Sequence, residues 1–263
     1  YEISCSLVGS EMCIRDRQRH SILGAEFIRS FLADTEADKQ LLRCIKYHHG
    51  RELSGAGLDI DDLAYVIYEA DNIAAGADRR EAEGDLNDRG AKFDSDLCLE
   101  NIFNVFSGDA EPSYFSLREL DAMKKENFPH GNKSIAKQGQ YASIMRYMEK
   151  NFRMKSPISM EENELLRILE DTLIYVPSST NTEEHADISL YDHMKMTGAT
   201  AAVLMKYMKT LGITDYKGFC FTHNKENRNK DVFLMISGDF SGIQKFIYHI
   251  RSEGAMRMLR GRS

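Results

Sequence analysis

The chain lacks most features that mark membrane, secreted or strongly basic proteins. Among its 263 residues, no apolar run approaches the roughly 18 residues that a membrane-spanning helix needs. Its 34 Lys and Arg are outnumbered by 41 Asp and Glu, and the formal net charge of -7 gives no general attraction to phosphate backbones. The five cysteines have no Cys-x-x-Cys spacing, which excludes a zinc knuckle and indicates reduced thiols. We therefore expect a soluble, cytoplasmic protein without a membrane partner.

The N-terminal segment also lacks the charged and apolar regions of a signal peptide. Instead, Leu7 to Arg17 (LVGSEMCIRDR) match one reading frame of a transposase adapter that is used to prepare sequencing libraries. Residues 1–17 are therefore treated as an adapter-like, non-native segment and excluded from the fold prediction. We expect native sequence from about Gln18, in a fragment that is open at both ends.

Apolar residues recur at helical spacing through much of the remaining chain. The pattern predicts helices over 20–32, from about Asp38 to a terminating Gly50, and over 59–76, 132–155, 159–176 and 189–212. Residues 81–96 are acidic and predict an exposed loop, and 97–106 predict a short strand or an apolar staple. After Gly212 the unbroken apolar runs 218–222 and 231–240 predict strands of a buried sheet, followed by a helix over 241–250.

Three of the predicted helices carry titratable groups on faces that should be apolar. These are His20 on the first helix, His48 and His49 on the second, and Asp71 on the third. An ionised carboxylate buried without a partner costs several kcal/mol, so Asp71 requires a hydrogen-bond donor or a metal. Histidine and aspartate suit metals such as Mn²⁺, Fe²⁺ or Ni²⁺. From spacing alone, a hydrogen-bonded core histidine and a helix-capping aspartate explain the pattern at least as often as a metal site does.

Several segments, in a fixed order, resemble one known family. RHSILGAEFIRSFL, IKYHHGREL and AYVIYEADNIAAGADRR resemble the HD domain of the large subunit of type III-A (Csm-type) CRISPR effector complexes. VPSSTNTEEHADISLYDHMKMTGATAA matches a later motif of that family, and Ser237 to Ser263, with SGDFSGIQKFIY and LRGRS, match another. On these motifs, from His20 to the end, the chain is identified as a member of this family.

The resemblance implies a mainly α fold with three native parts. Residues 18–105 would form a partial HD-type domain, 106–213 a linker and helical connector, and 214–263 the start of an α/β ferredoxin-like Palm domain. It also implies a metal-dependent single-strand DNase at the HD domain, and synthesis of cyclic oligoadenylates from ATP by two Palm domains. The implied cofactors are a divalent metal of Mn, Ni or Mg type and ATP with Mg. The implied partners are other Csm-type subunits, guide RNA, target RNA and single-stranded DNA.

Site residues are carried over position by position from the resemblance. His20, His48, His49 and Asp71 would be metal ligands, and the last three of these would be catalytic. The His-Asp dipeptide that the family places upstream of this segment occurs nowhere in the chain, and neither does the Gly-Gly-Asp-Asp motif of the second Palm domain. Because metal affinity depends on ligand number, we expect no useful nuclease or cyclase activity from this chain alone.

Two further motifs allow both a functional and a structural interpretation. SGDFSGIQ, with a turn before a predicted helix, makes Asp239, Ser241 and Gly242 candidate ATP contacts by the resemblance, whereas a tight turn explains the glycines alone. In DISLYDH, Asp187, Asp192 and His193 could imitate a second metal site. We interpret Asp187 instead as a helix N-cap, and Asp192 and His193 as residues of the first turn of a helix that packs on its neighbours. The alternatives for the whole chain are a stand-alone HD phosphohydrolase and a non-catalytic scaffold with a degenerate site.

Overall fold

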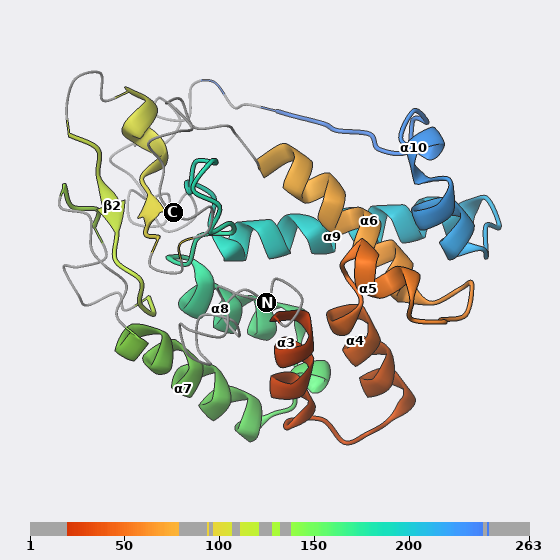
Figure 1. Ribbon diagram of the computed structural model, residues 1–263, viewed down its shortest axis with the longest axis horizontal. Helices are drawn as coiled ribbons and strands as arrows, with labels where there is room; N and C mark the ends of the chain where they lie inside the picture. The colour runs from red at the N-terminus through yellow and green to blue at the C-terminus, as the bar shows by residue number, and fades with distance from the viewer. Residues whose placement is uncertain are drawn as a thin grey trace, which may run out of the picture. The chain divides into compact units, whose positions relative to one another are not determined.

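The computed structural model describes residues 20–78, 94, 97–106, 111–120, 128–131, 138–238 and 241. The chain divides into two compact units, Tyr1–Lys230 and Asp231–Ser263, and each is considered by itself. The first unit is built mainly from helices (Figure 1), so the predicted helical fold class is confirmed. Over the described residues, no helix combines the length and the apolar character that a membrane span requires.

Over residues 20–78, the structure describes four helices: α3 (His20–Arg29), α4 (Glu36–Lys46), α5 (Gly50–Ser54) and α6 (Leu63–Asp78). A capping box starts α4, because the Thr35 hydroxyl accepts from the Asp38 amide and the Asp38 carboxylate accepts from the Thr35 amide. The prediction that Gly50 ends this helix is wrong. Gly50 instead begins α5, and a Cβ there would lie 3.2 Å from the Tyr68 ring.

The largest apolar core lies among α7 (Gln138–Met154), α8 (Glu162–Leu173) and the start of α9 (Leu190–Thr210). A short 3-10 helix, η4 (Pro157–Ser159), joins α7 to α8. The predicted helical patterns of all three segments are confirmed, since each buries one side. The core residues are Leu117, Tyr141, Ile144, Met148, Phe152, Ile168, Leu173, Val176, Leu190 and Tyr191.

Helix α6 packs along α9 and makes the most extensive contact between described helices (Figure 1). Buried small residues on both helices, Ala70 and Ala74 on α6 and Ala201 on α9, permit close approach. Helix α9 ends where Gly212 takes a positive φ of 67°, a conformation that glycine adopts without strain. The α6–α9 contact brings residues near position 70 against residues near position 190.

A two-stranded antiparallel sheet, β1 (Leu99–Glu100) with β2 (Tyr114–Phe115), flanks the core. Leu99 pairs with Phe115 and Glu100 pairs with Tyr114. A 3-10 helix, η2 (Ile102–Phe106), follows β1. The short strand predicted within 97–106 is therefore confirmed for two residues, and the second half of that segment is the 3-10 helix.

The strand predicted over 218–222 is wrong, because these residues form a π-helical turn, η5 (Gly218–Thr222), followed by α10 (Asn224–Asn227). Cys220 is fully buried, and the Phe221 ring packs edge-on against Tyr68 of α6 with centroids 5.2 Å apart. An apolar run of five residues is too short for its periodicity to separate a strand from a buried helical turn. The segment thus completes the helical unit.

In the second unit, residues 231–238 have no regular secondary structure and no strand pairing to any described residue. Leu234, Met235 and Ile236 are 85%, 92% and 86% exposed, so the prediction of a buried sheet strand is wrong for these described residues. The helix predicted over 241–250 lies outside the described residues except for Ser241. The compact unit begins at Asp231, whereas the predicted Palm boundary at 214 and the HD assignment stay predictions.

Candidate functional site

His48 is positioned by the end of helix α4. Its side chain is buried, at 5% exposure, and its Nδ1 donates to the Ile45 carbonyl at 2.8 Å. This carbonyl belongs to the last turn of α4, where no intrahelical donor remains. Because Nδ1 carries the proton, Nε2 carries the lone pair in the neutral ring. The adjacent His49 ring packs against it with centroids 3.8 Å apart, and His49 is also the N-cap residue of α5.

Asp71 on α6 is hydrogen-bonded to His193, which lies 122 positions later in the sequence. Its Oδ1 accepts from His193 Nε2 at 3.1 Å, and the side chains of His193 and Asp71 are 15% and 24% exposed. Burial by itself would raise the pKa of Asp71, but the hydrogen bond from His193 and the charges of nearby histidines outweigh burial and lower it. Those histidines include His48 and His49. The four side chains therefore form one electrostatic cluster with Asp71 as its anion.

His193 is held in place by the N-terminus of α9. The Ser189 hydroxyl accepts from the Asp192 amide at 3.0 Å and donates to the Asp192 carboxylate at 2.7 Å. Ser189, and not Asp187, is thus the N-cap of α9, so that detail of the prediction is wrong. The His193 amide donates to the Ser189 carbonyl, which begins the regular helix. The cap fixes the direction of the first turn and hence the position of the imidazole beside Asp71.

The remaining predicted site residues are only partly described. His20 is the first residue of α3, and its side chain lies outside the described part of the structure. Asp239 and Gly242 also lie outside it, and Ser241 is exposed in a turn. The structure thus gathers His48, His49 and Asp71, adds His193, and leaves the roles of His20 and of the ATP contacts as predictions.

The donor types at the cluster suit a divalent metal, because imidazole nitrogen and carboxylate oxygen bind Mn, Fe, Ni and Zn ions. A histidine that donates its other ring N–H to a backbone carbonyl, as His48 does, is typical of a metal ligand. Within the described residues, however, no group of three or more His, Cys, Asp or Glu side chains is arranged to hold a metal ion. These side chains by themselves therefore do not fit a complete metal centre.

A second buried carboxylate on α6, Glu69, has different partners. Arg228 donates to both of its oxygens, at 2.6 and 2.9 Å, and Asn224 donates to one of them at 3.1 Å. Glu69 is 4% exposed, and the bidentate pair ties α10 to α6. No local sequence pattern marks Glu69, because its partner lies 159 positions away. This network is structural and closes the helical unit around residues 214–230.

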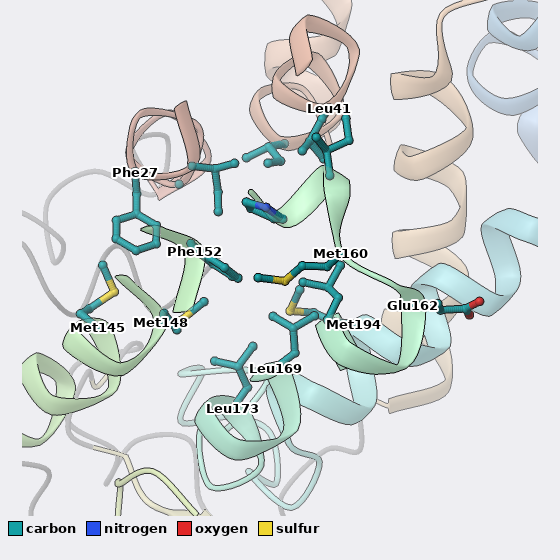
Figure 2. Close-up of a pocket in the computed structure, with 16 residues that line it drawn as sticks. Phe27, Leu41, Met145, Met148, Phe152, Met160, Glu162, Leu169, Leu173 and Met194 are labelled. Carbon is teal, nitrogen blue, oxygen red and sulfur yellow. The ribbon is translucent and has the colours of Figure 1, made fainter. Parts of the chain in front are cut away.

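An apolar pocket of about 530 Å³ adjoins the histidine cluster within the first unit. Its wall includes Ile45, whose carbonyl accepts from His48, and Met194, which follows His193. Phe152, Met160 and Met194 point into the pocket, whereas the Glu162 carboxylate points away at its edge (Figure 2). Side chains from α3, α4, α7, α8 and α9 thus enclose a space whose walls are almost entirely apolar.

Comparison with known proteins gives consistent matches along the chain. A family profile described as Csm1 subunit domain B matches residues 232–263. A protein of Streptococcus thermophilus named CRISPR system single-strand-specific deoxyribonuclease Cas10/Csm1 (subtype III-A) is 36% identical over 251 residues, which cover 94% of this chain and 32% of the relative. A protein of Enterococcus italicus with the same name is 34% identical over 250 residues, covering 93% of this chain and 33% of the relative.

Solved structures show the same fold. A Csm1–Csm4 cassette in complex with cA4 matches with a TM-score of 0.58 and 24% identity, covering 99% of this chain and 33% of that chain. The crystal structure of Csm1 from T. onnurineus matches with a TM-score of 0.58 and 23% identity, covering 93% and 30%. The molecule is thus of the class of large subunits of subtype III-A CRISPR systems. The chain belongs to the Cas10/Csm1 family and spans about a third of the length of its curated relatives.

Proposed function

We propose that this chain carries part of the nuclease site of a Cas10/Csm1-type protein, and that the longer protein cleaves single-stranded DNA. The proposal is supported by one observation above all: Asp71, which is ionised and paired with His193, lies among His48 and His49 in a chain similar to single-strand-specific deoxyribonucleases. Asp71 would keep His193 oriented with its Nε2 proton toward α6. His48 would carry an Nε2 lone pair, fixed by its bond to the Ile45 carbonyl.

The test compares Asp71→Asn with Glu170→Gln in a full-length protein that contains this sequence. Glu170 is exposed on α8 and has no part in the cluster, so it controls for the loss of one carboxylate. We expect Asp71→Asn to slow cleavage of a labelled single strand about 100-fold or more, and Glu170→Gln to leave the rate unchanged. Equal rates for both variants would refute the site assignment.

For the chain of 263 residues alone we propose no useful cleavage, because the described donors do not complete a metal centre. The matching measurement is single-strand cleavage by this chain in the presence of Mn²⁺. Robust cleavage that His48→Ala or Asp71→Ala abolishes would contradict the proposal. If the full-length protein does not cleave single-stranded DNA, the favoured second function is a non-catalytic scaffold that binds other Csm subunits, as the Csm1–Csm4 neighbours suggest.

We also propose that the longer protein makes cyclic oligoadenylates from ATP and Mg, with Asp239, Ser241 and Gly242 contacting nucleotide. The supporting observations are the Csm1 domain B match over these residues and the neighbour solved in complex with cA4. Guide and target RNA would reach it through the effector complex. An Asp239→Ala variant of the full-length protein should lose oligoadenylate synthesis while single-strand cleavage persists, and unchanged synthesis would remove Asp239 from the proposed contacts.

A further inference from the structure

We propose that the apolar pocket beside the histidine cluster is a subsite for one unstacked nucleobase of single-stranded DNA. The inference rests on the proposed nuclease function and names a part of its substrate recognition. A base can enter such a pocket only after it leaves the stack of its neighbours, which a single strand permits at low cost and a duplex resists. The pocket would then contribute to the preference for single strands.

The lining of the pocket suits the flat face of a base. Phe27 and Phe152 contribute aromatic rings, and the four methionines Met145, Met148, Met160 and Met194 contribute flexible, polarizable thioethers. Aromatic surfaces bind bases of any sequence, because each base has a π-face, and methionine adapts its shape to a ligand. The volume of about 530 Å³ lies within the range of small-molecule pockets.

The pocket adjoins the candidate nuclease site, and this position favours a base of the DNA substrate as its occupant. Ile45 lines the pocket and holds His48 through its carbonyl, and Met194 lines the pocket directly after His193 in α9. A strand whose base occupied the pocket would therefore have its adjacent backbone close to the cluster. The described lining gives no charged partner to an ionic ligand. Its single charged residue is Glu162, whose carboxylate points away from the pocket (Figure 2).

The charge of the chain supports base recognition over phosphate recognition. With a formal net charge of -7, the chain has no general attraction to phosphates, and any phosphate contact would have to be local. Affinity would come from apolar contact with bases, and binding would depend weakly on salt. We expect log Kd against log salt to change with a slope of about 1 or less, which corresponds to one or two phosphate contacts.

The experiment uses the whole chain and short thymidine strands with a central 2-aminopurine, or with an abasic residue in its place. We expect 2-aminopurine emission to rise on binding, because the base leaves its stacked neighbours, and the abasic strand to bind about tenfold more weakly. Met160→Glu should weaken binding of the 2-aminopurine strand about tenfold. Met196→Glu changes the charge equally on the exposed face of α9 and should have less than a twofold effect.

Three results would overturn the subsite: no binding of the single strand, equal affinity for the abasic strand, or equal effects of the two glutamate variants. The abasic comparison uses the unaltered chain, so it decides the question even if Met160→Glu does not fold. Cleavage by the full-length protein separates this inference from the proposed function. If cleavage does not depend on the central base, only the base subsite is refuted. If binding depends on the base but cleavage does not depend on Asp71, only the nuclease assignment is refuted.

Discussion

Two carboxylates, one buried and one half-buried, lie two positions apart on α6, and their partners differ in kind. Glu69 is 4% exposed and is neutralised by a guanidinium that binds both of its oxygens. Asp71 keeps 24% of its side chain exposed and is paired with an imidazole, while two more histidines act on it through their charges. Arginine stays protonated at all physiological pH values, whereas histidine changes its charge near neutrality.

Because their partners differ, Glu69 belongs to a fixed structural contact, whereas the histidines around Asp71 can gain and lose protons. The Glu69 network closes the contact between α6 and α10, and every polar atom that it uses has a charged or amide partner. The Asp71 cluster joins α4, α6 and α9 through imidazole and carboxylate side chains. Helix α6 thus carries the Glu69–Arg228 ion pair, here called the anchor, on one side and the candidate site at Asp71 on the other.

The largest expected effect comes from breaking the anchor. Arg228→Met leaves the Glu69 carboxylate buried without its cation, which should lower the free energy of unfolding by about 3 kcal/mol in urea titrations. Arg153→Met removes the guanidinium from an exposed pair with Glu149 and should cost about 0.5 kcal/mol or less. A Glu69→Met and Arg228→Met double variant should recover most of the loss. Equal losses for Arg228→Met and Arg153→Met would contradict the anchor role.

How far the sequence predicts the molecule depends on which physical signal each part carries. Helices such as α8 and α9 were predictable because each buries one side, and that side repeats at the helical period. The helical turn around Cys220 was not predictable, because a run of five apolar residues shows neither the helical nor the strand periodicity. Asp71 was predictable as a charged residue on an apolar stripe. Its pairing with His193, at 122 positions' separation, depends on the packing of α6 against α9, which no local pattern encodes.

An intermediate effect is expected at Asp71 itself, and it should depend on pH. The folded-state pKa of Asp71 lies below its ordinary value of 3.8, so its carboxylate stabilises the fold at pH values above that range. This contribution is lost as pH falls through the folded pKa. Asp71→Asn should therefore cost about 1 kcal/mol at pH 7, and the difference from the unaltered chain should narrow as pH falls below the ordinary value of 3.8 and through the lowered folded-state pKa.

Urea unfolding of both proteins at several pH values measures this difference, and Glu170→Gln, which removes an exposed carboxylate outside the cluster, provides the control. A gap that stays constant or widens in acid would show that the Asp71 carboxylate is not stabilised by the histidines. That result would also remove the main electrostatic distinction between Asp71 and Glu69.

The smallest effect concerns Cys220, which reports on the Glu69 side of the helix. Burial, followed by the charge of Glu69, raises the pKa of its thiol to about 12, so alkylation at pH 8 should be very slow. Glu69→Gln removes the negative charge and should shift the pH–rate curve of Cys220 alkylation toward lower pH, as measured by mass spectrometry of the labelled peptide. Asp71→Asn should leave this curve in place. A uniform rise in rate at every pH would instead indicate opening of the α6–α10 contact, and equal shifts in both variants would show that the two carboxylates do not act on separate sides of α6.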